Sequence, residues 1–283
     1  MLSVDVVVLT AVCTIAVAAG ALVALRWGRL RTNRTQSTTV GEMPGREALL
    51  RFLRIIAIGV GAGAVSGVLV LGCGGRLVMR ILAATSGDGA QGLLTEAEER
   101  VGEITLSGTF GFVIFIGFFG GIFGALVYLL VRRWLAGSAW VAGLVVGVLG
   151  LGFARLDPLD PDNVDFAILR PDWLAVLLLG LLPLLYGVVV VSMIERLDRS
   201  YPTLAWRPSA ILAHLPLLAL VVFPPFIVGM ILAGTFAAFT PRMQRLRRAW
   251  DNPALLRAGQ VLVGALAVAG LGFVGTGVVR ILS

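Results

Sequence analysis

Lysine is absent from this chain of 283 residues, so arginine supplies all 23 of its basic side chains. A GC-rich genome would produce this count, and the abundance of glycine, alanine, valine and leucine fits that origin. A guanidinium does bind phosphate and carboxylate in a fork that an ammonium cannot match. Because codon bias alone explains the count, the missing lysine decides nothing about ligands.

Charge of either sign is scarce. Charged residues make up 14% of the chain, against about 25% in soluble domains, and the mean hydropathy is +0.95. Apolar runs of roughly 20 residues recur along the whole length, which is what crossing a hydrocarbon core requires. We therefore expect an all-α, polytopic transmembrane helical bundle, multi-pass in the cell membrane and specifically in a bacterial plasma membrane.

Cysteine and histidine are too few for the usual cofactor sites. Cys13 and Cys73 both lie in apolar stretches, so neither a disulfide framework nor a metal cluster is indicated. His214 is the single histidine, which excludes a bis-histidine haem and is typical of a hydrogen-bonded structural residue. Motifs for intramembrane hydrolysis are also missing. We expect no cofactor and favour a non-enzymatic protein.

Six apolar runs predict full membrane spans, at about 4–25, 53–73, 110–131, 139–154, 173–194 and 257–279. The second run continues past Gly74 and Gly75, and a single helix over 55–84 would be about 45 Å long. We therefore expect a bend near these two glycines, with 76–84 in or just above the outer interface.

The stretch 209–240 is apolar but is interrupted by Pro224 and Pro225. Two adjacent prolines remove two backbone donors, so a straight helix through them is excluded. The stretch predicts a proline-broken helical hairpin, either re-entrant or a pair of short crossings. The bundle then has six full spans and up to eight membrane helices.

Arginine counts give the orientation, because cytoplasmic loops carry the excess of basic residues. If 209–240 enters and leaves on one side, the cytoplasmic loops hold 17 of the 23 arginines and a net charge of +12, and the outer side holds −5, within a total of +7. Both termini then lie outside. We divide the chain into an N-terminal helix (1–31) that is peripheral to the bundle, a flexible cytoplasmic linker (32–47) and the transmembrane bundle (48–283).

Glycines at four-residue spacing form faces on three of the predicted spans: Gly59, Gly63 and Gly67; Gly117 and Gly121, with Gly120 and Gly124; and Gly143 and Gly147. Small residues at this spacing let helix backbones approach closely within a membrane. The faces predict tight packing inside the bundle, with a homo-oligomer seam as the alternative.

Four arginines run against the general charge bias by lying at the outer ends of spans: Arg76, Arg80, Arg155 and Arg280. If the bundle brings these ends together, their guanidinium groups would form a site for an anion or a lipid headgroup. The alternative is pairing with the acidic outer loops.

Acidic side chains are dense in the outer loop 155–172. Its aspartates Asp157, Asp160, Asp162 and Asp165 form a weak candidate for a Ca²⁺ site. The spacing is not that of an EF-hand, and a solvated, turn-rich loop is the alternative. In the other outer loop, 76–108, the segment Thr95-Glu96-Ala97-Glu98 has the spacing of a capping box and predicts a short helix from Glu96.

These patterns favour a membrane-embedded binding or accessory subunit that presents an ordered outer surface from 76–108 and 155–172. The alternative is a transporter or flippase-like protein for a lipid or small amphiphile that uses the broken hairpin. No carboxylate lies deep in an apolar run, as ion-coupled transport would require. We expect membrane lipids as partners, with a protein partner or a second copy on the glycine faces. Nucleic acid is excluded despite a pI near 10.8, because the charge is arranged by membrane side.

Overall fold

The computed structural model describes residues 4–32, 45–95, 100–103, 105–135, 137–154, 159–204, 207–222, 229 and 252–283. Helix dominates these residues, and no named strand occurs among them. Five helices are long and apolar enough to cross a membrane: Val7–Trp27, Leu49–Thr85, Leu106–Trp134, Asp172–Leu197 and Pro253–Leu282. The predicted all-α membrane class is confirmed.

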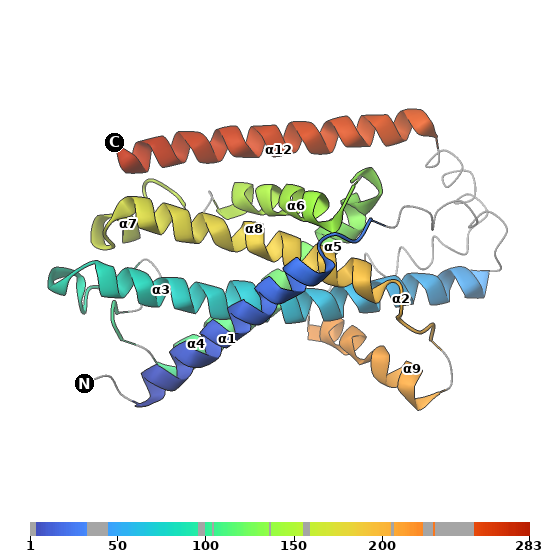
Figure 1. Cartoon of the computed structure of the whole chain (residues 1–283), viewed down its shortest axis with the longest axis horizontal. Coiled ribbons are helices and arrows are strands. Elements are labelled where there is room, and N and C mark those ends of the chain that lie inside the picture. The colour runs from blue at the N-terminus through green and yellow to red at the C-terminus, as the bar shows by residue number, and fades with distance from the viewer. Residues whose placement is uncertain are drawn as a thin grey trace.

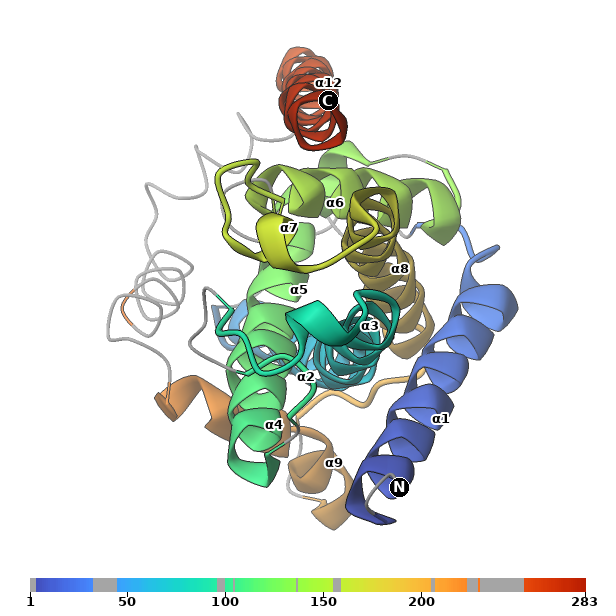
Figure 2. The same cartoon turned by 90° about the vertical axis from the view of Figure 1, so that its left-hand side faces the viewer.

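Two composite helices and two plain ones form the centre of the bundle (Figures 1 and 2). The first composite helix joins α2 (Gly45–Ser66), the π-helical η3 (Gly67–Gly72) and α3 (Cys73–Thr85). The second joins α4 (Leu106–Phe112), the π-helical η5 (Val113–Phe119), α5 (Gly120–Val131) and the 3-10 turn η6 (Arg132–Trp134). The plain helices are α6 (Ala139–Ala154) and α8 (Asp172–Leu197). The two composite helices pack on each other, and α6 packs along α8.

The remaining elements lie around this centre (Figure 2). Helix α1 (Val4–Trp27) contacts α3 and α8, and α12 (Pro253–Leu282) contacts α6. The hairpin's first half, α9 (Pro208–Ala213) and the 3-10 helix η7 (Leu215–Val222), covers α2. Short turns of helix, η4 (Asp88–Ala90) and α7 (Asp165–Ile168), lie in the outer segments.

Glycine faces hold the centre together, as predicted. A Cβ added to Gly63 would lie 2.6 Å from the Gly121 carbonyl oxygen, and one added to Gly143 would lie 2.5 Å from the Val188 Cα. Backbone therefore meets backbone on both sides of the core. These glycine faces are already occupied by contacts within one chain. A protein partner or a second copy would therefore need other surfaces, and its existence stays a proposal.

The long second helix does not bend where the sequence suggested. Residues Gly45–Thr85 form one continuous helical run, and the departure from α geometry lies earlier, at Gly67–Gly72. Gly74 and Gly75 sit inside α3, where an added Cβ would lie 2.8 Å from Leu182 and 2.7 Å from Phe112. Close packing on both sides keeps the helix straight through the glycine pair, which corrects the expected bend.

Helix α6 has the predicted bounds, 139–154, but with 16 residues it is shorter than the other five spans. At 1.5 Å per residue it is about 24 Å long, slightly less than a hydrocarbon core of roughly 30 Å. Helix α8 and the second composite helix extend the predicted bounds by a few residues at their ends. The count of six full crossings therefore stays a prediction.

Within the hairpin 209–240 the structure describes residues 209–222 and 229, so Pro224 and Pro225 lie outside the described residues. Its first half is not one α-helix, because α9 ends at Ala213 and a 3-10 helix follows from Leu215. Pro216 has no N–H to continue the α-helical hydrogen bonding. Instead it packs against α2, where a Cβ added to Gly61 would lie 3.3 Å from its ring.

Both ends of the chain lie at the same end of the bundle (Figure 1). The C-terminal end of α1 docks beside Gly137–Trp140 at the arginine-rich end of the bundle, and Arg280 lies near Asp162 at the opposite end. Figure 1 accordingly shows the start of α1 and the end of α12 at the same end of the molecule. The arginine count assigns that end to the outside, and this assignment remains a prediction.

Cysteine labelling tests the orientation. In a background without Cys13 and Cys73, we place one cysteine at Gly89 and another at Ser200, both exposed and at opposite ends of the bundle. A membrane-impermeant maleimide should label Gly89→Cys in intact cells and Ser200→Cys only after permeabilisation, because the arginine-rich end faces the cytoplasm. The reverse pattern would invert the topology.

Candidate functional site

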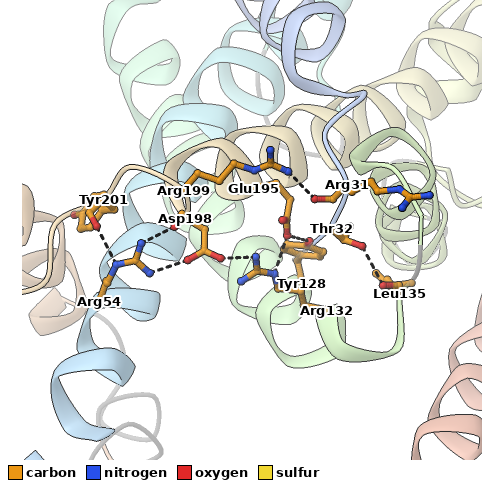
Figure 3. A network of polar contacts seen from close by, with 10 residues as sticks. All are labelled: Arg31, Thr32, Arg54, Tyr128, Arg132, Leu135, Glu195, Asp198, Arg199 and Tyr201. Carbon is orange, nitrogen blue, oxygen red and sulfur yellow. Dashed lines mark hydrogen bonds and ion pairs between the residues drawn. The ribbon is translucent and has the colours of Figure 1, made fainter. Parts of the chain in front are cut away.

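Buried charge gathers at the arginine-rich end of the bundle, where α2, α5 and α8 end or begin (Figure 3). Glu195 is 0% exposed, Asp198 5% and Arg54 9%. The side chain of Arg132, directly after α5, is 11% exposed. Charged side chains are almost never this buried unless they are paired.

Arg132 lies at the centre of this cluster. Its Nε donates to Glu195 Oε1 at 2.7 Å, and its Nη2 donates to Asp198 Oδ2 at 2.7 Å. The Tyr128 hydroxyl donates to the same Glu195 oxygen at 2.7 Å. One guanidinium thus joins α5 to both carboxylates at the end of α8.

Arg54 completes the charge cluster from α2. Its Nη1 donates to Asp198 Oδ1 at 2.7 Å and its Nη2 to the Asp198 carbonyl oxygen at 2.6 Å. Its Nε donates to the Tyr201 carbonyl oxygen at 3.0 Å. Two guanidinium groups therefore balance two carboxylates, and three helices are tied together at one end.

Residue spacing explains the cluster. Glu195 and Asp198 are three residues apart at the end of α8, and Tyr128 and Arg132 are four apart at the end of α5, so each pair shares a helix face. The two carboxylates lie at the C-terminal end of α8, where the helix dipole is negative and disfavours negative charge. The positive guanidinium groups offset this repulsion.

Both acids are included in the net charge of +12 that the arginine count assigns to the cytoplasmic loops, but their burial shows that they are not exposed loop charges. One sequence feature could have indicated this burial. Tyr128 and Arg132 share a face at the end of one span, and Glu195 and Asp198 share a face at the end of another span on the same membrane side.

The carboxyl of Asp198 stays ionised. Burial alone would raise its pKa, but the guanidinium charges of Arg132 and Arg54 outweigh that effect and hold the pKa below its ordinary value. Oppositely charged neighbours thus stabilise the charged form of Asp198. The buried charge cluster therefore acts as a structural lock that holds these helices together.

A hollow of about 340 Å³ lies next to the charge cluster, lined by Arg51, Arg54, Tyr201 and Thr203. The Tyr201 hydroxyl donates to the Ala213 carbonyl oxygen and so ties this end to α9. Buried His214 follows α9, where its Nδ1 donates to the Ala210 carbonyl oxygen at 2.8 Å and its ring lies edge-on to Tyr201, with 5.5 Å between centroids. His214 is the hydrogen-bonded structural residue that the sequence indicated.

The opposite end of the bundle, which the arginine count assigns to the outside and which we call the outer end, is also ordered. The Arg170 N–H donates to Ser86 Oγ at 2.8 Å, joining the start of α8 to the end of α3 across 84 residues of sequence. Gln91 Nε2 donates to the Ala83 carbonyl oxygen at 2.8 Å. A small apolar cluster seals the same contact: Ala83, Ala90 and Val101 against Ile168 and Leu169. The two outer segments therefore fold against each other.

An outer hollow of about 670 Å³ opens between the loop before α8 and the end of α12. Arg170, Arg280, Asp162 and Asp172 line it, over the ring of Phe166. Arg170 pairs with Asp172 at 2.7 Å, and Arg280 lies 4.0 Å from Asp162. The hollow combines an apolar wall with charges of both signs.

The arginines of the predicted anion site have different neighbours. Arg76 lies over the ring of Phe112, 5.2 Å from its centroid, and Arg80 is half-buried on α3. Arg280 lines the outer hollow, and Arg155 lies outside the described residues. Convergence of the four on one ligand stays a proposal.

The predicted metal ligands take part in turns. Asp160 Oδ1 accepts from the Asp162 N–H at 3.1 Å, and Asn163 Oδ1 accepts from the Asp165 N–H at 2.7 Å. Asp157 lies outside the described residues, as does the segment of the predicted capping-box helix. Within the described part of the chain, no three histidine, cysteine or acidic side chains are placed to hold a metal ion.

Comparisons with other proteins add no family. No protein-family model, curated protein or solved structure matches this chain. Function must therefore be argued from the geometry of this structure alone.

Proposed function

We propose that this membrane protein is a non-enzymatic binding or accessory subunit, and that its outer surface, formed by 83–95, 100–101 and 159–172, is the part that meets its partner. The observation that carries the proposal is the Ser86–Arg170 hydrogen bond with its apolar cluster, which fixes two segments distant in sequence into one surface. Ordered loops on a rigid scaffold are the usual carriers of binding.

Two further features support this function. The central helices meet backbone to backbone through glycine, which leaves little room for a path through the bundle. The buried charges at the arginine-rich end pair with one another, so the lock stabilises the helix arrangement. Both features suit a scaffold with a fixed shape.

The outer hollow is the place we assign to a ligand of this surface. Arg170 and Arg280 line it beside an apolar wall, a combination that suits an anionic headgroup with an apolar tail. Of the four arginines predicted to bind an anion, this proposal keeps Arg280, which lines the hollow with its neighbours. Anionic lipids of this kind would come from the cell membrane in which we expect the protein to lie.

Photo-crosslinking in native membranes tests the binding role. A photoreactive residue at Gly89, in the outer surface, should give a protein adduct of one defined mass. The same residue at Gly272, exposed on α12 with open space around it, should give lipid adducts only. Equal protein adducts at both positions, or none at Gly89, would contradict the proposal.

A transporter or flippase for a lipid or small amphiphile is the second candidate. The observation in its favour is the pair of π-helical segments, η3 and η5, which pack on each other, together with the discontinuity between α9 and η7. Such irregular helix segments are frequent at functional sites. Rapid loss of outer-leaflet fluorescent lipid from proteoliposomes would favour this candidate over the first.

A further inference from the structure

The two cysteines of the chain lie together although they are distant in sequence. Cys13 is in α1 and Cys73 begins α3; these two helices pack on each other, and the two thiols are close enough to interact electrostatically. Both are free thiols; Cys13 is 3% exposed and Cys73 is half-buried. Their positions in two apolar stretches gave no indication of a disulfide framework, because the sequence does not show that the two helices lie side by side.

Two glycine contacts show independently that α1 packs side by side with the helix containing Cys73. A Cβ added to Gly20 would lie 3.1 Å from Val70, and one added to Gly74 would lie 3.5 Å from Val17. The two helices therefore run antiparallel with successive turns in contact. One turn before Val17, α1 presents Cys13 to the same face of α3.

Only a small part of the surface of helix α1 is buried. Its buried positions form a narrow stripe of small residues, Cys13, Gly20, Ala24 and Gly28. The arginine-rich end of this stripe is fixed by backbone hydrogen bonds, among them Trp140 N–H to the Gly28 carbonyl at 2.8 Å. At its outer end, the buried member of the stripe is Cys13.

We propose that Cys13 and Cys73 form a reversible dithiol–disulfide site that clamps the outer half of α1 onto α3. Its oxidant is a membrane-dissolved quinone, because both thiols lie in membrane-spanning helices. The two S–H bonds break and one S–S bond forms. The two electrons and two protons reduce the quinone to its hydroquinone.

The clamp has a physical consequence. A disulfide between these residues closes a loop of about 60 residues and removes freedom from the unfolded chain. It also fixes a helix that buries only a narrow stripe against the bundle. The oxidised protein should therefore be more stable, with α1 held against the centre.

The test uses the full chain in phosphatidylcholine–phosphatidylglycerol liposomes, treated with a short-chain benzoquinone and then denatured with excess maleimide. We expect both cysteines to become unreactive together, to recover with a phosphine reductant and to yield one Cys13–Cys73 crosslinked peptide. The oxidised form should melt on the order of 5 °C higher.

A matched control moves one thiol. In Cys13→Ala with Ala18→Cys, the thiol passes to the exposed side of α1, and quinone should leave both thiols free. Two maleimides per chain after quinone treatment of the natural protein would overturn the proposal. Equal crosslinking in the control, or crosslinks only between chains, would overturn it too.

Discussion

Replacing Arg132 with methionine should lower the free energy of unfolding by about 3–5 kcal/mol, the usual cost of breaking a buried ion pair from one side. Glu195, which is 0% exposed, would lose its charged hydrogen bond from Arg132 and keep the neutral one from the Tyr128 hydroxyl. Asp198 would lose one of its two guanidinium partners. Equilibrium unfolding in mixed detergent micelles measures the loss.

An exposed ion pair provides the control for this substitution. Arg170 pairs with Asp172 at the same 2.7 Å, but its side chain is 62% exposed, so Arg170→Met should cost less than about 1 kcal/mol. Combining Arg132→Met with Glu195→Met should recover much of the stability, because no charge is then left alone at that position. Equal losses for Arg132→Met and Arg170→Met would show that the cluster is not a lock.

Gly63→Leu should destabilise the bundle by roughly 3 kcal/mol, at the upper end of what overpacking costs. The first atom of the new side chain would lie 2.6 Å from the Gly121 carbonyl oxygen and 2.9 Å from the Ile122 Cα. These are backbone atoms of a neighbouring helix, so no rotamer change can relieve the clash. The thermal midpoint in detergent should fall accordingly.

The matched control for this substitution is Gly272→Leu on α12. An added Cβ at Gly272 meets nothing within 4 Å, so the leucine should enter the apolar surroundings with little change in stability. A Gly63→Leu protein as stable as Gly272→Leu would contradict the backbone contact between α2 and α5. An equal loss of stability in both variants would show that the effect comes from replacing a helical glycine as such and not from the contact at Gly63.

The spans were predictable because lipid leaves the backbone few choices. Without water, every peptide group must bond within its own helix, so a long apolar run is a helix wherever it packs. The run 139–154 matches α6 residue for residue, and 173–194 lies within α8. Glycine spacing likewise predicted faces of close contact, since only a missing side chain allows backbones to meet.

Contacts between distant segments were not predictable in the same way. Glu195 reads as a loop charge in the sequence, because only the meeting of α5 and α8 places Arg132 over it and lets it be buried. Cys13 and Cys73 read as two unrelated apolar residues until α1 lies antiparallel to α3. The expected bend at Gly74 failed for the same reason, since packing against Leu182 keeps the helix continuous.

The sequence by itself determined that this is a helical membrane protein, where its long apolar helices lie and which helix faces can approach closely. These are local properties, set by the hydrophobicity and size of residues within one helix. Only the tertiary structure decided which charges are buried, which outer segments interlock and where the two thiols meet. Those features depend on pairs such as Ser86 with Arg170, 84 residues apart, whose contact depends on how the whole bundle packs.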